Sequence, residues 1–501
     1  MSAALLVAGT TSDAGKSVVT TGLCRALARR GLRVAPYKAQ NMSNNSMVCR
    51  TPAGDTAEIG RAQWVQAVAA GAQPEPAMNP VLLKPGGDRR SHVVVMGHPA
   101  GEIASAEFVG GRRHLAQAAY DAFDDLSGRY EMVVAEGAGS PTEINLREGD
   151  YVNLGLARRF GIPTVVVGDI DRGGMFAAMF GTVALLDADD QRLVAGFVVN
   201  KFRGDVDLLR PGLAELELLT GRPVYGVLPW HPDLWLDSED ALDLDARRAP
   251  DPDTAAIRVA VVRLPRISNF TDVDALGLEP GLDVAIVSDP RAIRDADLVV
   301  LPGTRATLAD LVWLRRQGID RAIHVHAAAG GPVLGICGGY QMLGRAVRDP
   351  DGIEGEPGAD VPGLGLLDVT TEFARDKVLS LSHGTAYGAA VRGYEIHHGA
   401  VLPGADVEEF PGGGRAGHVV GTLWHGSLEN DAFRAAYLAE VAAARGRTWS
   451  ASGVRFASAR ERRLDLLGDL VEQHLDVDRL VDLASRGPAR DVPTLAPGDR
   501  R

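Results

Sequence analysis

A cysteine set among glycines, where a buried strand meets a helix, constrains the fold of this chain more than any other feature. The apolar run 332–336 is typical of a buried strand of a parallel sheet, and helix-period residues begin at Tyr340. Cys337 therefore lies on a sharp strand-to-helix turn, within Gly335-Ile-Cys-Gly-Gly339. This is the arrangement of a nucleophile elbow with sulfur in place of oxygen. The pattern predicts an α/β fold with a nucleophile at the carboxyl end of a strand.

The glycines around Cys337 suit a reactive cysteine. They allow the strained turn and leave room for a substrate, while the N-terminus of the following helix favours the thiolate. Gly338 N–H is placed to stabilise an oxyanion, and Gly303, after the predicted strand 298–301, is expected to complete the oxyanion hole. The alternative is a buried structural cysteine, but a lone core cysteine requires none of these glycines.

A cysteine nucleophile requires a base that is distant in sequence but near in space. Two late segments that glycines border, 393–399 and 421–426, carry the candidates His397, His398 and His425. The residues alone leave the choice among these three open.

A second strand–loop–helix unit opens the chain. The predicted strand 3–8 leads into a glycine-rich loop, 9–17, and then into a predicted helix. In such a loop the backbone N–H groups bind phosphate, Lys16 reaches the outer phosphates of ATP, and the Ser17 hydroxyl ligates Mg²⁺. Thr10 stands where the usual loop has its first glycine, and this spacing resembles that of dethiobiotin synthetase and its relatives. A mere turn is the alternative. The ATP contacts predicted in the loop are Gly9, Thr10, Thr11, Gly15, Lys16 and Ser17.

Four further buried apolar runs each end in a polar residue: Lys38, Glu136, Asp169 and Asn200. The carboxyl ends of parallel strands form the binding crevice of such sheets. We expect Lys38 and Asn200 to contact ATP and Glu136 to be the second protein contact of Mg²⁺. For Lys38 the alternative is a solvated loop, and for a carboxylate it is a helix cap. Caps explain four such strand ends poorly.

The length of the chain indicates more than one domain, because 501 residues exceed what one hydrophobic core organises. A stretch rich in Pro and Asp at 246–253 separates the two motif-bearing halves. We predict a P-loop parallel-sheet domain over 1–246 and an α/β domain with Cys337 over 254–446. Over 447–501 we predict a C-terminal helix and a disordered tail.

Composition excludes some classes of partner. The net charge is 52 − 65 = −13, which disfavours a nucleic-acid partner. Three cysteines, odd in number and scattered, indicate a reducing compartment. No apolar run reaches transmembrane length, and the segment 3–8 lacks the flanks of a signal peptide. We therefore expect a cytoplasmic protein without a membrane partner.

Together these motifs resemble those of the cobyric acid synthase family of the cobalamin pathway, over essentially residues 3–445. The elbow, the Gly303 loop and His425 are similar to a triad-type glutamine amidotransferase domain, here behind a dethiobiotin-synthetase-like P-loop domain. The motifs that carry the resemblance are Tyr37-Lys-Ala-Gln-Asn-Met, Glu136-Gly-Ala-Gly-Ser-Pro, Asp169-Ile-Asp-Arg-Gly-Gly, Asn200-Lys-Phe-Arg-Gly-Asp, Ser268-Asn-Phe-Thr-Asp272, Gly335-Ile-Cys-Gly-Gly-Tyr and Tyr394-Glu-Ile-His-His-Gly.

The resemblance implies ATP- and Mg²⁺-dependent amidation of the b, d, e and g side-chain carboxylates of adenosylcobyrinic acid a,c-diamide, with glutamine as nitrogen donor. It maps the nucleophile to Cys337 and the catalytic histidine to His425. A corrinoid polycarboxylate needs local cations in a net-acidic enzyme. The residues that we expect around this substrate are Lys84, Asp169, Asp171, Arg172 and Arg203. The oligomeric state stays open.

The sequence departs from its relatives at two positions. Related amidotransferases carry His-x-Glu, but position 427 here is Ser, so no acid lies two residues after His425. We therefore expect a Cys337–His425 dyad, with Glu429 as the nearest substitute acid and more plausibly a helix cap. Asn41 stands near where the a,c-diamide synthase relatives carry Asp, which favours the cobyric acid branch.

A different class of function is the alternative. P-loop folds of this kind also serve as dimerising ATPase switches that position cargo without covalent chemistry. The C-terminal half would then be an inactive amidotransferase-like domain. The intact elbow at Cys337 and the presence of His425 argue against that alternative.

Overall fold

Six parallel strands form the central sheet of the N-terminal half, in the order β12-β11-β10-β1-β9-β2. The computed structural model describes residues 2–86, 90–104, 113–232, 234, 256–488 and 491–496. β1 lies inside the sheet, so the loop that follows it opens at the carboxyl edge between two neighbouring strands. The strands are β1 (Ala3–Gly9), β2 (Val34–Tyr37), β9 (Met132–Glu136), β10 (Thr164–Asp169), β11 (Val194–Phe202) and β12 (Val224–Pro229).

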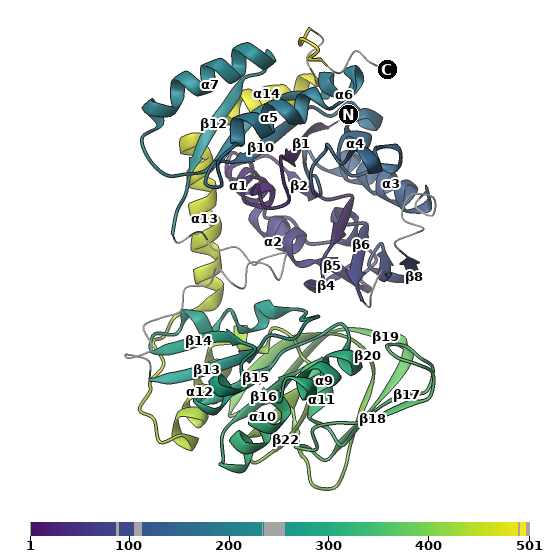
Figure 1. Ribbon diagram of the computed structural model, residues 1–501, viewed down its shortest axis with the longest axis vertical. Helices are drawn as coiled ribbons and strands as arrows, with labels where there is room; N and C mark the ends of the chain where they lie inside the picture. The colour runs from purple at the N-terminus through teal and green to yellow at the C-terminus, as the bar shows by residue number, and fades with distance from the viewer. Residues whose placement is uncertain are drawn as a thin grey trace.

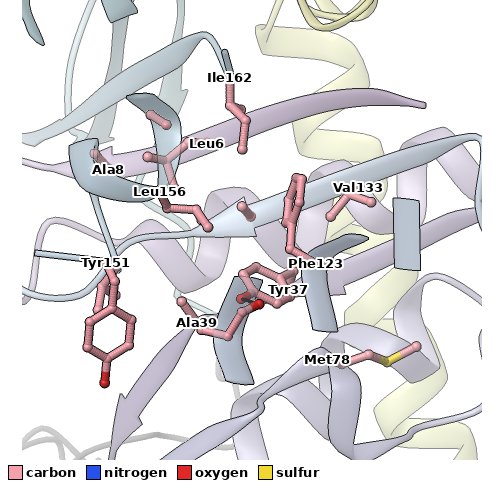
Figure 2. Packing of buried hydrophobic residues seen from close by; sticks show 14 of the residues in the cluster. Leu6, Ala8, Tyr37, Ala39, Met78, Phe123, Val133, Tyr151, Leu156 and Ile162 are labelled. Carbon is pink, nitrogen blue, oxygen red and sulfur yellow. Dashed lines mark hydrogen bonds between the residues drawn. The ribbon is translucent and has the colours of Figure 1, made fainter. Parts of the chain in front are cut away.

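Helices cover both faces of this sheet, because successive side chains of its buried strands point to opposite faces. Leu6 packs with α3, α4 and α5, whereas Leu5 packs with α1, α2 and the two C-terminal helices, α13 (Phe456–His474) and α14 (Val477–Arg486). Figure 2 shows the first face, where the rings of Tyr37 and Phe123 meet edge to face with centroids 5.2 Å apart. The helices of this half are α1 (Lys16–Arg29), α2 (Arg61–Ala69), α3 (Arg113–Arg129), α4 (Leu154–Phe160), α5 (Met175–Ala184), α6 (Ala188–Leu193) and α7 (Val206–Thr220).

The chain between β2 and β9 adds two small sheets, β3-β6-β7-β8 and β4-β5. Their strands are β3 (Gln40–Met42), β4 (Ser46–Arg50), β5 (Thr56–Gly60), β6 (Val81–Pro85), β7 (Arg90–Val95) and β8 (His98–Ala104). The antiparallel β4–β5 hairpin leads directly into α2.

A second α/β domain follows, built on the sheet β14-β13-β15-β16-β23-β22-β21. Its first five strands are parallel and the last two pairings are antiparallel. One face packs on α12 and the other on α9, α10 and α11. The strands are β13 (Ile257–Val262), β14 (Leu282–Val287), β15 (Leu298–Leu301), β16 (Val333–Ile336), β21 (Glu408–Phe410), β22 (Gly413–Ala416) and β23 (Val419–Thr422). The helices are α8 (Pro290–Arg294), α9 (Thr307–Arg316), α10 (Ile319–Ala328), α11 (Gly338–Leu343) and α12 (Asp431–Ala444).

A long hairpin of the second domain reaches the first domain. It consists of β19 (Val369–Ala386) and β20 (Ala389–Pro403), in a sheet completed by β17 (Ala346–Asp349) and β18 (Ala359–Pro362). The Thr56 hydroxyl donates to the Leu379 carbonyl oxygen at 2.9 Å, so β5 contacts β19. The two domains therefore meet through two hairpins.

The C-terminal helices return to the N-terminal domain, where α13 (Phe456–His474) and α14 (Val477–Arg486) lie beside it (Figure 1). α13 packs along α1, and Arg25 pairs with Asp465 at 2.7 Å. The tail that we expected to be disordered is bound where the structure describes it, because Leu495 N–H donates to Gln191 Oε1 at 2.7 Å. The predicted limits at 246 and 254 and the segment 497–501 lie outside the described residues. The division into 1–246, 254–446 and 447–501 stays a prediction.

Candidate active site

The backbone at Cys337 is strained in the way that the elbow requires. Cys337 lies between β16 and α11 with φ 50° and ψ −111°, a conformation that non-glycine residues rarely adopt. Its thiol is buried. A Cβ at Gly338 would lie 2.6 Å from Thr304 Cγ2, and one at Gly339 would lie 2.0 Å from the Leu301 carbonyl oxygen. Glycine is therefore required at both positions for α11 to pack beneath the cysteine.

His425 faces this cysteine from the segment that follows β23. Backbone hydrogen bonds with Tyr394 hold it in place, and the two rings stack with centroids 5.4 Å apart. Nδ1 of the imidazole lies 2.7 Å from Asp272 Oδ2, and the other carboxylate oxygen of Asp272 accepts from Gly426 N–H at 2.8 Å. Burial favours the neutral imidazole, but the charge of Asp272 and then that of Cys337 outweigh burial and raise the pKa of His425 to about 10. The site thus favours the imidazolium form of His425.

The expected Cys337–His425 dyad without an acid is wrong, because Asp272 occupies the acid's place at His425. Asp272 lies in the 3₁₀ turn Phe270–Val273, 153 residues before His425. The motif Ser268–Asp272 carried part of the family resemblance, but we assigned no role to Asp272. The serine at position 427 alone therefore led to the wrong expectation of a dyad. Glu429 points elsewhere and pairs with Arg61 at 2.9 Å and with Arg460 at 3.0 Å.

The other two histidine candidates lie near the cysteine but have different partners. His397 contacts Glu395 Oε2 at 3.1 Å through Nε2, and His398 Nδ1 lies 3.2 Å from the Ala374 carbonyl oxygen. Burial, followed by the charges of Arg305 and Lys377, lowers the pKa of His398 to about 4. Among the three, the geometry favours His425 as the base.

The two predicted oxyanion glycines lie at the site. Gly338 begins α11, where the helix itself supplies no acceptor for the N–H group. A Cβ at Gly303 would lie 3.1 Å from Cε1 of His425, so the loop after β15 faces the imidazole directly. Residues of both domains line the pocket at Cys337, and they include Asn44, Lys84, Asn269, Arg305, Gln341, Glu354, Lys377 and His425.

The glycine-rich loop of the N-terminal domain forms the second site. Lys16 Nζ donates to the carbonyl oxygens of Thr11, Ser12 and Gly139 at 2.9, 3.0 and 3.0 Å. Gly15 has φ 95°, and a Cβ there would lie 1.9 Å from Nδ2 of Asn200. Because Asn200 also donates to the Ala14 carbonyl oxygen at 3.0 Å, it packs on the loop, and its contact with ATP stays a prediction. Thr10 N–H donates to the carbonyl oxygen of Val167, which anchors the start of the loop beyond Gly9.

The donor set beside this loop fits Mg²⁺. Ser17 Oγ donates to Glu136 Oε1 at 3.0 Å, and Lys38 Nζ lies 2.9 Å from the same oxygen. Burial opposes the ionised carboxyl, but Lys38 and then Lys16 outweigh burial and lower the pKa of Glu136. One carboxylate and one hydroxyl are the protein ligands that Mg²⁺ takes when phosphates and water complete its shell. Within the described ranges no group of three His, Cys, Asp or Glu residues gathers for a metal.

Four of the five residues expected at the corrinoid lie together beside Asp13 of this loop. Arg172 pairs with Asp13 at 2.8 Å, and Arg203 pairs with Asp171 at 2.9 Å. Asp169 joins them through Lys201, whose Nζ lies 2.8 Å from its Oδ2. Lys201 also donates to the Asp13 carbonyl oxygen at 2.9 Å, although we assigned it no role.

Lys84 lies apart from those four residues. It lines the pocket at Cys337, where its Nζ lies 2.5 Å from Glu58 Oε1. The residue is buried, with only 5% of its surface accessible to solvent. Its place is therefore at the domain interface.

Comparison with known proteins identifies both halves. The model of the CobB/CobQ-like glutamine amidotransferase domain matches residues 258–433, and that of the CobQ/CobB/MinD/ParA nucleotide binding domain matches residues 5–243. A cobyric acid synthase of Mycolicibacterium gilvum is 69% identical over 494 residues, which cover 99% of each chain. One of Mycobacterium tuberculosis is 69% identical over 496 residues, again covering 99% of each chain.

Two further findings complete the comparison. A solved glutamine amidotransferase covers 37% of this chain and 98% of its own, at 21% identity and a TM-score of 0.30, a likeness that carries no argument. Across the described helices, none has the length and apolar character needed to span a membrane.

Proposed function

Because the chain belongs to the cobyric acid synthase family, we propose that it amidates the b, d, e and g side-chain carboxylates of adenosylcobyrinic acid a,c-diamide. Glutamine supplies the nitrogen and ATP the energy. The observation that carries this proposal is the pairing, in one chain, of a Cys337–His425–Asp272 arrangement with a phosphate-binding loop. Amidation by transferred ammonia needs both sites.

The first half of the reaction releases ammonia from glutamine at Cys337. The thiolate attacks the side-chain amide carbon, and the N–H groups of Gly338 and Gly303 stabilise the oxyanion. Protonated His425 donates its proton to the amide nitrogen as the C–N bond breaks, so ammonia leaves and the γ-glutamyl group stays on Cys337 Sγ as a thioester. A water molecule then gives a proton to His425 and attacks the thioester, which releases glutamate and restores the thiolate. Asp272 orients the imidazole throughout.

The second half activates a substrate carboxylate. Bound at the Gly9–Ser17 loop, ATP with Mg²⁺ supplies phosphoryl transfer, which turns a carboxylate oxygen into a leaving group. Lys16 and the loop amides hold the phosphates, while Ser17 and Glu136 hold the metal. Lys38 neutralises charge beside Glu136. Arg172 and Arg203 lie at the same edge of the sheet and suit the remaining carboxylates of a corrinoid.

Two variants test this division of labour with the a,c-diamide substrate and ATP. Cys337→Ser should abolish amidation with glutamine and preserve amidation with an ammonium salt, because Cys337 belongs only to the ammonia-producing site. Lys16→Ala should lower amidation with either nitrogen source by roughly 10³-fold, because Lys16 stabilises the transferring phosphoryl group.

Mass spectrometry of the corrinoid products and glutamate release are the measurements. Equal loss with both nitrogen sources in Cys337→Ser would contradict the proposal, and a wild-type chain that forms neither amide nor glutamate would favour an ATPase switch.

A further inference from the structure

Polar groups, most of them buried, lie between the pocket at Cys337 and the carboxylate of Glu136, where Mg²⁺ is predicted to bind. This run of polar groups begins at Asn44, which lines the pocket together with Cys337 although it belongs to the N-terminal domain. Its Oδ1 atom is buried and has no hydrogen-bond partner in the part of the chain that the structure describes. The carbonyl oxygen of the next residue, Asn45, accepts from Arg61 N–H at 3.0 Å. The pocket wall therefore abuts the start of α2.

The residue before Arg61 is Gly60, and three polar side chains converge on it. A Cβ at Gly60 would lie 2.7 Å from Gln63 Oε1, 2.8 Å from Asn79 Oδ1 and 2.9 Å from Asn41 Nδ2. The φ of Gly60 is −57°, which any residue adopts, so the backbone does not require glycine. Glycine is required here because a Cβ would clash with these three groups. Asn41 Nδ2 donates to Gln63 Oε1 at 2.9 Å, and Gly60 N–H donates to Asn79 Oδ1 at 3.1 Å.

The run continues along one face of α2. Gln63 and Gln66 are three residues apart, so they lie on the same side of the helix, and both are fully buried. Gln63 Nε2 and Gln66 Oε1 have no hydrogen-bond partner among the described residues. Gln66 Nε2 donates to Glu136 Oε2 at 2.6 Å. The run thus ends on the carboxylate that Ser17 and Lys38 also contact.

The groups left over along this run match ammonia. Buried polar atoms without a partner are costly, so each marks a place where a small polar molecule is stabilised. Ammonia has three N–H donors and one lone pair, so it pairs with the spare oxygens of Asn44 and Gln66 and with the spare N–H of Gln63. The three cations that line the pocket at Cys337, Lys84, Lys377 and Arg305, outnumber its carboxylates, which are Glu354 and the Glu58 that binds both lysines. This excess of positive charge disfavours a charged ammonium ion in the pocket.

We propose that Gly60, Gln63 and Gln66 line the path by which ammonia released at Cys337 reaches the activated carboxylate beside Glu136. Gly60 lets the polar groups of Asn41, Gln63 and Asn79 approach one another, and the two glutamines are positioning residues that pass the neutral molecule along α2. This inference rests on the proposed function and assigns its transfer step to particular side chains.

The test is the number of glutamate molecules formed per amide formed. Gly60→Ala places a methyl group at the convergence point, so this ratio should rise by roughly threefold or more while amidation with an ammonium salt stays near the wild-type rate. Gln63→Leu removes the polar end at similar volume and should raise the ratio in the same way. Gly128→Ala in α3 is the control, because its Cβ would meet nothing within 4 Å and should leave the ratio unchanged.

The outcomes separate this inference from the function on which it rests. If both variants fold and keep the wild-type ratio, the leftover polar groups hold only water and the path lies elsewhere. Equal loss with glutamine and with ammonium salt in both variants would place these residues in the synthetase site and also overturn the inference. A wild-type chain inactive with both nitrogen sources would instead contradict the proposed function.

Discussion

At the scale of single residues, the active site depends on one contact that sequence reasoning missed. Local patterns predicted Cys337 and Gly338, because a strand, a turn and a helix in succession fix their geometry. Asp272 was not predictable in this way, since 153 residues separate it from His425 and only the folded sheet brings the two together. The acid two residues after the histidine is replaced by one from another loop.

Asp272→Asn should lower glutaminase turnover by roughly 10²-fold or more, because an amide neither holds the imidazole in the correct tautomer nor stabilises the imidazolium. Glu429→Gln is the matched control and should cost less than about 10-fold, because Glu429 contacts Arg61 and Arg460 rather than His425. His425→Ala should cost roughly 10³-fold. Glutamate release at saturating glutamine measures all three, and a mild effect of Asp272→Asn would mean that the thiolate needs no oriented base.

The same contact predicts how stability depends on pH. The pKa of folded His425 is about 10, above its ordinary value of 6.5, because Asp272 and Cys337 outweigh burial. A raised folded pKa means that the protonated histidine stabilises the fold fully below about pH 6.5, and that this contribution disappears as the pH rises towards 10. The difference in free energy of unfolding between wild type and Asp272→Asn should therefore shrink from pH 6.5 to pH 10. Urea unfolding at several pH values measures it, and a difference independent of pH would contradict the raised pKa.

At the scale of elements, the strand–loop–helix units were predictable from the sequence, whereas the distant helices that pack on them were not. The P-loop and the elbow each lie within one strand–loop–helix unit, so their residues converge as the spacing predicted. The docking of α13 on α1 joins segments more than 400 residues apart. No local pattern encodes such a contact, and for the same reason the tail at 491–496 was expected to be disordered although Leu495 is bound.

Gly22→Ala in α1 tests whether that docking stabilises the fold. In an isolated helix this change stabilises by up to about 1 kcal/mol. Here the added Cβ would lie 2.5 Å from Val471 Cγ2 and 2.9 Å from the Leu467 carbonyl oxygen, both in α13. Overpacking of this kind costs about 1–3 kcal/mol, so we expect a net loss of about 1 kcal/mol in the free energy of unfolding.

Gly128→Ala in α3 is the matched helix control, since its Cβ would meet no neighbour within 4 Å. We expect it to be neutral or stabilising by about 0.5–1 kcal/mol. Urea unfolding of both variants gives the comparison. Stabilisation by Gly22→Ala as well would mean that α13 does not pack on α1 as described.

At the scale of the whole molecule, two reaction sites are held in one chain by contacts made from both domains. Glu429 of the amidotransferase domain, four residues after His425, pairs with Arg61 at the start of α2 and with Arg460 of α13. Ser46 N–H donates to Asn269 Oδ1 at 2.8 Å across the same interface. In the proposed reaction ammonia crosses this interface, which would then serve the reaction as well as the fold.

A buried ionic cluster lies at the interface between the two domains. Glu58 is 1% accessible and binds Lys84 of its own domain, the Ser46 hydroxyl at 2.6 Å, and Lys377 of the β19–β20 hairpin. Burial opposes the charged forms of these groups. Even so, the two lysines lower the pKa of Glu58 far below its ordinary value, whereas burial lowers the pKa of Lys84 to about 8.

Glu58→Gln should lower the free energy of unfolding by about 3–5 kcal/mol, because it leaves two buried ammonium groups without their counter-charge. It should also reduce amidation with glutamine more than amidation with an ammonium salt, because the hairpin that Lys377 anchors faces the pocket at Cys337.

The triple variant Glu58→Gln, Lys84→Met, Lys377→Met removes every charge of the cluster at similar volume, so it should recover most of the lost stability. Urea unfolding and amidation with the two nitrogen sources are measured on both variants. If the triple variant were as unstable as Glu58→Gln, the loss would come from packing and not from unpaired charge, and recovery of stability without recovery of glutamine-dependent amidation would show that the cluster also acts in the transfer step.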